Sequence, residues 1–122
     1  MKIKNAIITK VDLSIGDHGC LSCWVHVMYN KESGQGFGGI NLCSLNRVAK
    51  DEIHSIAGHF ICRVMQIADV TNWNDLIGKS IRVKSEAHTI AAIGNIINDD
   101  WFDIKKVYSQ ALHEQKVRDL CE

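Results

Sequence analysis

The fold is decided by one stretch of the chain, Asp51-Glu52-Ile53-His54-Ser55-Ile56-Ala57-Gly58-His59-Phe60-Ile61-Cys62-Arg63-Val64-Met65-Gln66-Ile67-Ala68. Its apolar residues recur at steps of three and four, which is the spacing of one face of an α-helix. They are Ile53, Ile56, Ala57, Phe60, Val64, Ile67 and Ala68. The pattern predicts an amphipathic helix over Asp51–Ala68 that lays one apolar stripe against a sheet.

The residues before this helix read as strands. Lys4–Leu13 is rich in β-branched residues and is followed by a turn near Gly16. Cys20–Tyr29 alternates strictly, which places Leu21, Cys23, Val25, Val27 and Tyr29 on one face. Residues 30–36 form a predicted loop, and a partner strand is expected over Phe37–Cys43.

The residues after the helix continue the same kind of fold. Asn72–Lys79 is a predicted connection with one helical turn, and strands are expected over Ser80–Lys84 and Thr89–Ile97. A last helix is expected to start with Asp103 as N-cap and to run from Ile104 to about Leu120. We therefore predict an α+β fold, in which a small antiparallel sheet of four to six strands packs against one long helix.

The last predicted helix carries two apolar stripes. The first stripe ends at Leu112, and a displaced one resumes with Val117, Leu120 and Cys121. The second stripe faces another direction, so a second subunit could cover it and the helix would serve in dimerisation. The alternative is a frayed C-terminus, and the sequence favours neither.

Length and composition restrict the class of protein. The chain has 122 residues and predicts a single domain over 1–122. Its formal net charge is zero, so no overall field attracts nucleic acid or an acidic membrane surface. Five cysteines without repeated spacing, and an N-terminus unlike a signal peptide, favour a reduced cytosolic protein.

A glycine-rich stretch, Gly34-Gln35-Gly36-Phe37-Gly38-Gly39, matches the dinucleotide fingerprint G-x-G-x-x-G in letters only. That motif needs a helix directly after it, whereas Ile40–Cys43 reads as strand. Two interpretations remain. The glycines form a hairpin turn, or their backbone N–H groups face a phosphate, with Phe37 available to stack on a base.

Two other patterns could suggest metal sites. Cys20 and Cys23 form one CxxC, but residues three apart in a strand point to opposite faces and cannot share a metal. Asp99, Asp100 and Asp103 lack the spacing of a calcium loop, so a solvated turn is the favoured reading. Cys62 is expected to be a packed thiol. No catalytic motif is recognisable.

The stretch most informative about function is Gly94-Asn95-Ile96-Ile97-Asn98-Asp99-Asp100-Trp101-Phe102-Asp103. It combines amide side chains, aromatic rings and a helix start, which are the groups that grip a base-bearing anionic small molecule. Together with the absence of a catalytic motif, it indicates a binding protein and not an enzyme.

Three stretches carry a resemblance to a known family. They are Asp17–Leu21, Gly36–Gly39, and Ile93–Ile97 running into Trp101–Asp103. Over nearly the whole chain, the sequence resembles the first type of phage-encoded Thoeris anti-defence proteins. Members sequester the glycocyclic ADP-ribose signals of bacterial TIR-domain proteins without degrading them. Their fold is a small antiparallel sheet with two helices.

The resemblance implies partners and site residues for this chain. It implies a homodimer, with higher assemblies such as a hexamer in some members, no cofactor, and a location in the cytoplasm of the infected bacterial host. Some members also hold cyclic trinucleotides. The ligand-binding residues implied for this chain are His88, Thr89, Asn95, Arg118, Lys84, Phe37 and Gly38. Asn95 would contact the nucleotide, His88 would stack on the base, and Arg118, or Lys84 in its place, would pair with phosphate. The alternative is a phage structural or protein-binding module with no small-molecule ligand.

Overall fold

The computed structural model describes residues 2–16, 19–29, 33–42, 56–86 and 89–108. They form an α+β fold with one six-stranded antiparallel sheet in the order β3-β2-β1-β4-β5-β6. The strands are β1 (Lys2–Ile15), β2 (Leu21–Met28), β3 (Gly34–Gly38), β4 (Ser80–Glu86), β5 (Thr89–Gly94) and β6 (Trp101–Asp103). The helices are α1 (Ile56–Ala68), a 3₁₀ turn η2 (Trp73–Leu76) and the short α2 (Ile104–Val107). The predicted fold class and strand number are confirmed.

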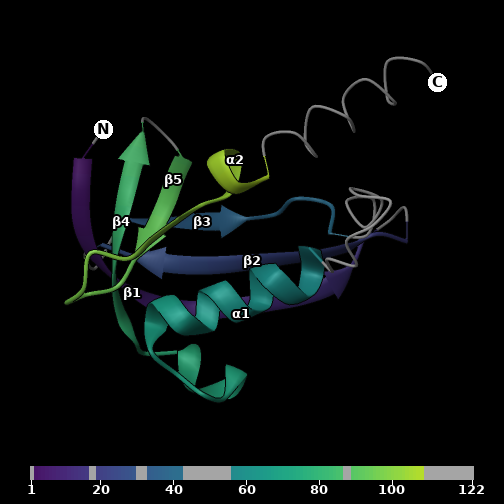
Figure 1. Ribbon diagram of the computed structural model, residues 1–122, viewed down its shortest axis with the longest axis horizontal. Coiled ribbons are helices and arrows are strands. Elements are labelled where there is room, and N and C mark those ends of the chain that lie inside the picture. The colour runs from purple at the N-terminus through teal and green to yellow at the C-terminus, as the bar shows by residue number, and fades with distance from the viewer. Residues whose placement is uncertain (1, 17–18, 30–32, 43–55, 87–88, 109–122) are drawn as a thin grey trace.

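β1 shapes the sheet because it pairs with a different strand along each half. Lys2–Ile7 pairs with β4 and Ile7–Ile15 pairs with β2, with an irregularity in the register between Ile8 and Lys10. A bulge at this point bends a strand and increases its twist. The β4–β5 strands consequently cross the β2–β3 strands steeply, and α1 runs in front of the sheet roughly along β2 (Figure 1).

α1 forms as its apolar periodicity predicts. Ile56, Phe60, Val64, Ile67 and Ala68 are buried, and Ala57, the other stripe residue in the described part of the helix, is partly buried. Residues 51–55, the predicted first turn, lie outside the described residues. The helix packs against the sheet through Phe60, whose ring centroid lies 5.9 Å from that of Phe37 and 5.5 Å from that of Phe102.

The alternation of apolar and polar residues predicts the buried face correctly in β2, the strand where it is most regular. In β2, Cys23, Val25 and Val27 are buried against the helix side, whereas Trp24 and His26 lie on the other face. The turn η2 was also predicted. Asn72 caps it, because its side chain accepts a hydrogen bond from the backbone N–H of Asn74.

β1, β2 and β4 differ from their predicted bounds by one or two residues at an end, and three larger differences occur. β3 lies over Gly34–Gly38, so the expected strand over Phe37–Cys43 is wrong and the glycine-rich stretch itself is the strand. β5 ends at Gly94, because the Asn95 side chain turns the chain there. β6 was not expected at all. Its three residues pair with Ala92–Gly94. This pairing cannot be inferred from the short Trp-Phe-Asp sequence alone.

α2 begins as expected, since the Asp103 side chain accepts a hydrogen bond from the backbone N–H of Lys106 at 3.2 Å. The described helix ends at Val107, and the rest of the predicted helix, with Val117, Leu120 and Cys121, lies outside the described residues. No helix in the described parts of the chain is long and apolar enough to cross a membrane.

Candidate functional site

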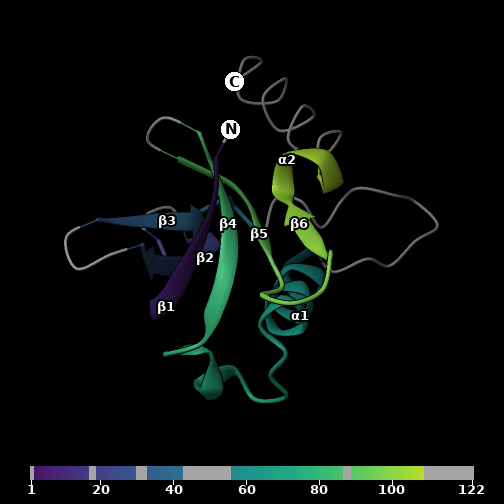
Figure 2. The same cartoon turned by 90° about the vertical axis from the view of Figure 1, so that its left-hand side faces the viewer.

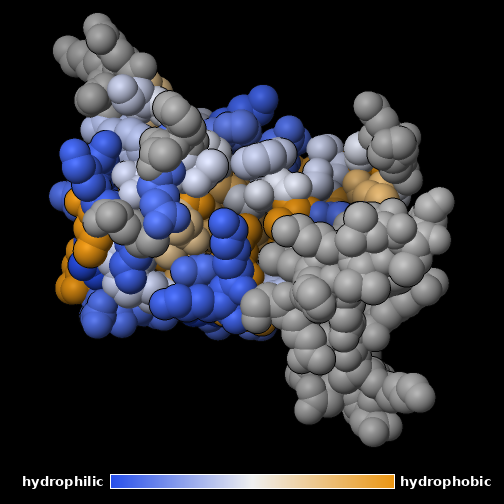
Figure 3. Space-filling model, turned by 90° about the horizontal axis from the view of Figure 1, so that it is seen from above, coloured by the Kyte–Doolittle hydropathy of each residue, from blue (hydrophilic) through white to orange (hydrophobic). Residues whose placement is uncertain are grey.

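A cleft of about 420 Å³ lies where the edge strand β3 approaches β5 and α2. We call it the Trp24 cleft. Its described lining residues are Trp24, Gly36, Gly38, Ile40, Glu86, Thr89, Ile90, Ala91, Ile104 and Lys105. They come from β2, β3, the residues just after β3, β4, β5 and α2. These elements meet because β1 bends the sheet. Viewed from above, apolar surface is exposed at the centre of the molecule between hydrophilic groups (Figure 3).

The aromatic wall of the cleft is the ring of Trp24. The side chain is 40% exposed. It lies on the face opposite the core because its neighbours in the strand, Cys23 and Val25, point inward and are buried. The ring stacks on that of His26, with centroids 6.3 Å apart and planes at 28°. It also lies against Gly36 and Gly39, where an added Cβ would collide with ring atoms. A rigid, exposed aromatic face of this kind can accept a base.

The second wall is the outer edge of β3, with which no other strand of the described residues pairs. The backbone hydrogen bonds Tyr29 N–H to Ser33 C=O and Gly39 N–H to Cys23 C=O fix the alternation of the β2–β3 ladder. In an antiparallel pair, every second residue points its N–H and C=O away from the neighbouring strand. By this register, Gly36 and Gly38 direct their backbone groups outward, and both line the cleft. Because neither has a side chain, a ligand can approach these groups closely.

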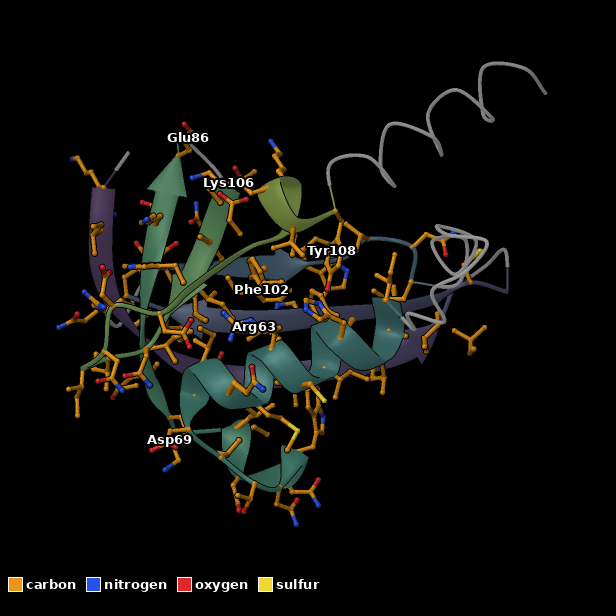
Figure 4. All side chains as sticks on the ribbon, viewed as in Figure 1. Arg63, Asp69, Glu86, Phe102, Lys106 and Tyr108 are labelled. Carbon is orange, nitrogen blue, oxygen red and sulfur yellow. The ribbon has the colours of Figure 1, made fainter. Side chains whose placement is uncertain are left out.

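Polar groups lie at the rim. Thr89 is exposed, and its hydroxyl donates to the Glu86 carbonyl at 3.3 Å. Lys105 is exposed on α2 and supplies a cation. Glu86, at the end of β4, and Lys106, on α2, lie at the same end of the molecule (Figure 4). Glu86 is the only carboxylate among the described lining residues.

The structure brings together only part of the predicted site. Gly38 and Thr89, 51 positions apart, both line the Trp24 cleft. His88 and Arg118 lie outside the described residues. Lys84 and Asn95 are not among the described residues that line the cleft.

Phe37 is not available to a ligand, which corrects its expected role. Its ring is fully buried between Phe60 and Phe102. The reason is the register of β3: Phe37 pairs with the buried Val25, so it points to the helix side. Trp24 lies on the opposite face and takes the place expected for an aromatic next to the glycines.

Asn95 is buried and holds the turn after β5. Its amide donates to the Ile67 carbonyl at 2.9 Å, and its side-chain oxygen accepts from the N–H groups of Ile97 and Asn98 at 2.9 and 2.8 Å. The Arg82 guanidinium binds the Asn95 and Asn98 carbonyls, each at 2.8 Å. These hydrogen bonds give the Asn95 side chain a structural role in the turn.

Lys84 lies over Trp101 on β6, with its ammonium 4.3 Å from the ring centroid. Arg82 lies 4.8 Å from the same centroid, and the ring covers Gly94, which has no Cβ to obstruct it. The basic and aromatic groups expected at one ligand site are therefore divided between β6 and the Trp24 cleft.

Sequence reasoning missed Trp24 and Lys105 as site residues. A signal for Trp24 was present, because strict alternation in β2 places a large aromatic on the face away from the core. No comparable signal existed for Lys105. Its position depends on where β6 ends and α2 turns, which is a tertiary outcome.

No group of three or more His, Cys, Asp or Glu side chains that could hold a metal occurs among residues 2–16, 19–29, 33–42, 56–86 and 89–108. Burial, and next the charge of Asp12, raise the pKa of the Cys23 thiol to about 11, so it stays protonated near neutral pH. Cys62 is exposed, which contradicts the expected packed thiol, because it falls on the solvent side of α1.

The aspartates after Asn98 have structural partners. Asp99 accepts from the Trp101 indole N–H at 2.9 Å, Asp100 pairs with Arg63 at 2.9 Å, and Asp103 caps α2. This agrees with the favoured reading of a solvated turn with a helix cap.

Comparison with known proteins gives no relative. No protein-family model matches the chain, and neither a curated protein nor a solved structure matches it.

Proposed function

We propose that this protein binds a nucleotide signal of the cyclic ADP-ribose type in the Trp24 cleft and sequesters it unchanged. In this role it would be a phage anti-defence protein that withholds glycocyclic ADP-ribose from a Thoeris effector. One observation carries the proposal: an exposed tryptophan ring and the outward backbone groups of a glycine-rich strand edge share one cavity.

The cleft suits the base of such a ligand. Its volume falls in the range of roughly 300–1,000 Å³ that is usual for small-molecule sites. The Trp24 ring is held by His26 on one side and by the glycines of β3, so stacking a base on it costs little side-chain entropy. Ile40, Ile90 and Ile104 supply the apolar surface that excludes water.

The same cleft suits the phosphates. The outward N–H groups of Gly36 and Gly38 are donors at a strand edge, where they form an anion-binding concavity. Lys105 adds a charge. A protein with zero net charge needs local donors of this kind to bind an anion. Glu86 is placed to accept from ribose hydroxyls.

We infer sequestration without bond cleavage from the kinds of groups in the described lining. Cleavage of a glycosidic bond usually uses two carboxylates on either side of it. The described lining supplies one, Glu86. The proposal extends to a homodimer formed through the C-terminal helix and to the host cytoplasm as the location. Cyclic trinucleotides are a further ligand to test.

A protein-binding module is the second candidate. The outer edge of β3 favours it, because backbone groups at a strand edge can pair with an extended peptide. Such a peptide would occupy the same cleft, so the two candidates predict competition between nucleotide and peptide.

The test is calorimetric titration of cyclic ADP-ribose into the protein, with Trp24→Ala as the main variant. Loss of a stacked base costs about 1–3 kcal/mol, so affinity should fall roughly ten- to a hundredfold. Trp101→Phe is the matched control, since Trp101 lies on β6 and does not line the cleft. Ligand released by heating the complex should be chemically intact by mass spectrometry.

Lysine variants of α2 test whether the positive charge of Lys105 contributes to binding the ligand. Lys105→Gln should weaken binding, whereas Lys106→Gln, on the next residue of the same helix and outside the described lining, should not. Unchanged affinity in both Trp24→Ala and Lys105→Gln would reject the Trp24 cleft as the site. Recovery of a degraded ligand would reject sequestration.

A further inference from the structure

A second hollow, of about 780 Å³, lies away from the Trp24 cleft and has no part in the proposed function. We call it the β1 hollow. Its side-chain walls include Asn5, Ile7, Thr9, Met28, Ser80 and Ile96. Ile7 is 49% exposed there, although it sits in the middle of β1 between two paired strands. Exposed apolar side chains in a hollow on a sheet face are a surface that a partner could bury.

An apolar projection stands beside the hollow. Ile97 follows Ile96 directly and is 85% exposed, the highest value among the large apolar residues of the described chain. The turn that carries it is rigid, because the Asn95 side chain binds the N–H groups of Ile97 and Asn98 and Arg82 binds the Asn98 carbonyl. Ile97 is therefore held out in solvent by the structure around it.

The charges around the two features are complementary. β1 from Lys2 to Lys10 contains three lysines and no acidic residue, and Lys79 precedes the lining residue Ser80. Of these, Lys10 and Lys79 are exposed and adjoin the lining residues Thr9 and Ser80, and Lys4 lies over the ring of Tyr29, which also lines the hollow. The projecting turn instead carries the exposed Asp99.

We propose that the occupant of the β1 hollow is the Ile97 turn of a second copy of this chain. A projection next to its own complementary hollow is self-complementary, since a two-fold axis between them places each Ile97 in the other copy's hollow. Ile97 would then contact Ile7 and Met28, and Asp99 would lie against the basic rim. This contact is independent of the C-terminal helix and of any ligand in the Trp24 cleft.

Light scattering on the full chain tests the contact in a Leu120→Glu background, which removes an association through the C-terminal helix. At micromolar concentration we expect a dimer mass in this background and a monomer mass when Ile97→Ser is added. Ile7→Ser should also give monomer. Ile15→Ser is the matched control, because Ile15 is 66% exposed at the end of β1, is not among the described lining residues of the hollow, and should leave the dimer.

A photo-crosslinking residue at position 97 identifies the occupant directly. Intermolecular adducts that map by mass spectrometry to residues 5–9 or 28–29 of a second copy support the proposal. A monomer mass in the Leu120→Glu background, a dimer that survives Ile97→Ser, or adducts that map elsewhere would each overturn it.

Discussion

At the scale of single residues, the environment of a side chain decides its role more than its chemical type does. Asn95 has the amide expected of a nucleotide contact, yet its hydrogen bonds go to Ile67, Ile97 and Asn98 within the protein. Phe37 has the ring expected of a stacking residue, yet the ring lies in the core. Trp24, which no motif marked, is the exposed aromatic of the cleft.

Replacing Asn95 should therefore destabilise the fold. Asn95→Ala leaves the buried Ile67 carbonyl and the N–H groups of the turn without their partner, which costs about 1–3 kcal/mol in the free energy of unfolding. Urea denaturation followed by circular dichroism measures the change. Asn98→Ala is the control, because only the Asn98 backbone takes part in the described hydrogen bonds and its side chain is exposed. Equal stability of Asn95→Ala and wild type would show that this network contributes little.

At the scale of elements, α1 packs into the core with one face and makes side-chain hydrogen bonds to the C-terminal part of the described chain with another. Phe60, Val64 and Ile67 face the sheet. On another side of the helix, the His59 ring nitrogen hydrogen-bonds with the Tyr108 hydroxyl at 2.5 Å. One turn later, Arg63 donates a hydrogen bond to Asp100. The helix therefore contacts both the sheet and the segment that leads through β6 into α2 (Figure 2). α2 in turn places Lys105 at the Trp24 cleft.

The packing of α1 gives a stability prediction. Phe60 is fully buried among Phe37 and Phe102, so Phe60→Ala should lower the free energy of unfolding by roughly 3–5 kcal/mol, because a cavity adds to the lost transfer energy. Chemical denaturation is the measurement, and Cys62→Ala on the exposed side of the same helix is the control. A Phe60→Ala effect no larger than that of Cys62→Ala would contradict this packing.

At the scale of the whole molecule, the bend of β1 and the side-chain contacts of α1 hold segments together that lie far apart in the sequence. The Arg63–Asp100 pair joins residues 37 positions apart, and Arg63 also donates to the Trp101 carbonyl at 3.2 Å. The hydrogen bond from Arg63, aided by its charge, holds the pKa of Asp100 below its ordinary value of 3.8. Stability at low pH should depend on this carboxylate.

The sign follows from linkage. A carboxylate whose pKa is lower in the folded state stabilises the fold above its unfolded pKa and loses that contribution as the pH falls through the folded value. Wild type should therefore lose more stability below pH 3.8 than Asp100→Asn does. Thermal melting across this pH range compares the two, with the exposed Asp75→Asn as the control that keeps the wild-type slope. Parallel profiles for wild type and Asp100→Asn would exclude the effect.

The sequence by itself determined the elements whose signals are local. The three- and four-residue steps of α1, the alternation in β2, and the cap Asp103 depend only on near neighbours, and all are present as predicted. The helical turn expected in Asn72–Lys79 is also present, and the structure adds that Asn72 caps it. Gly38 and Thr89, two of the ligand-binding residues implied by the resemblance, line the Trp24 cleft, and their role as ligand contacts stays a prediction. His88 and Arg118 lie outside the described residues, so their expected roles stay predictions.

The tertiary structure alone decided which groups meet. Strand β6 exists only because Ala92–Gly94 offers it a partner, and β3 is a strand despite its glycines because β2 supplies the ladder. Whether Phe37 or Trp24 faces a ligand depends on the register between these strands, since a shift of one residue exchanges the two faces of a strand. Local preference carries no information about register, and for this reason the site could be placed only after the sheet was known.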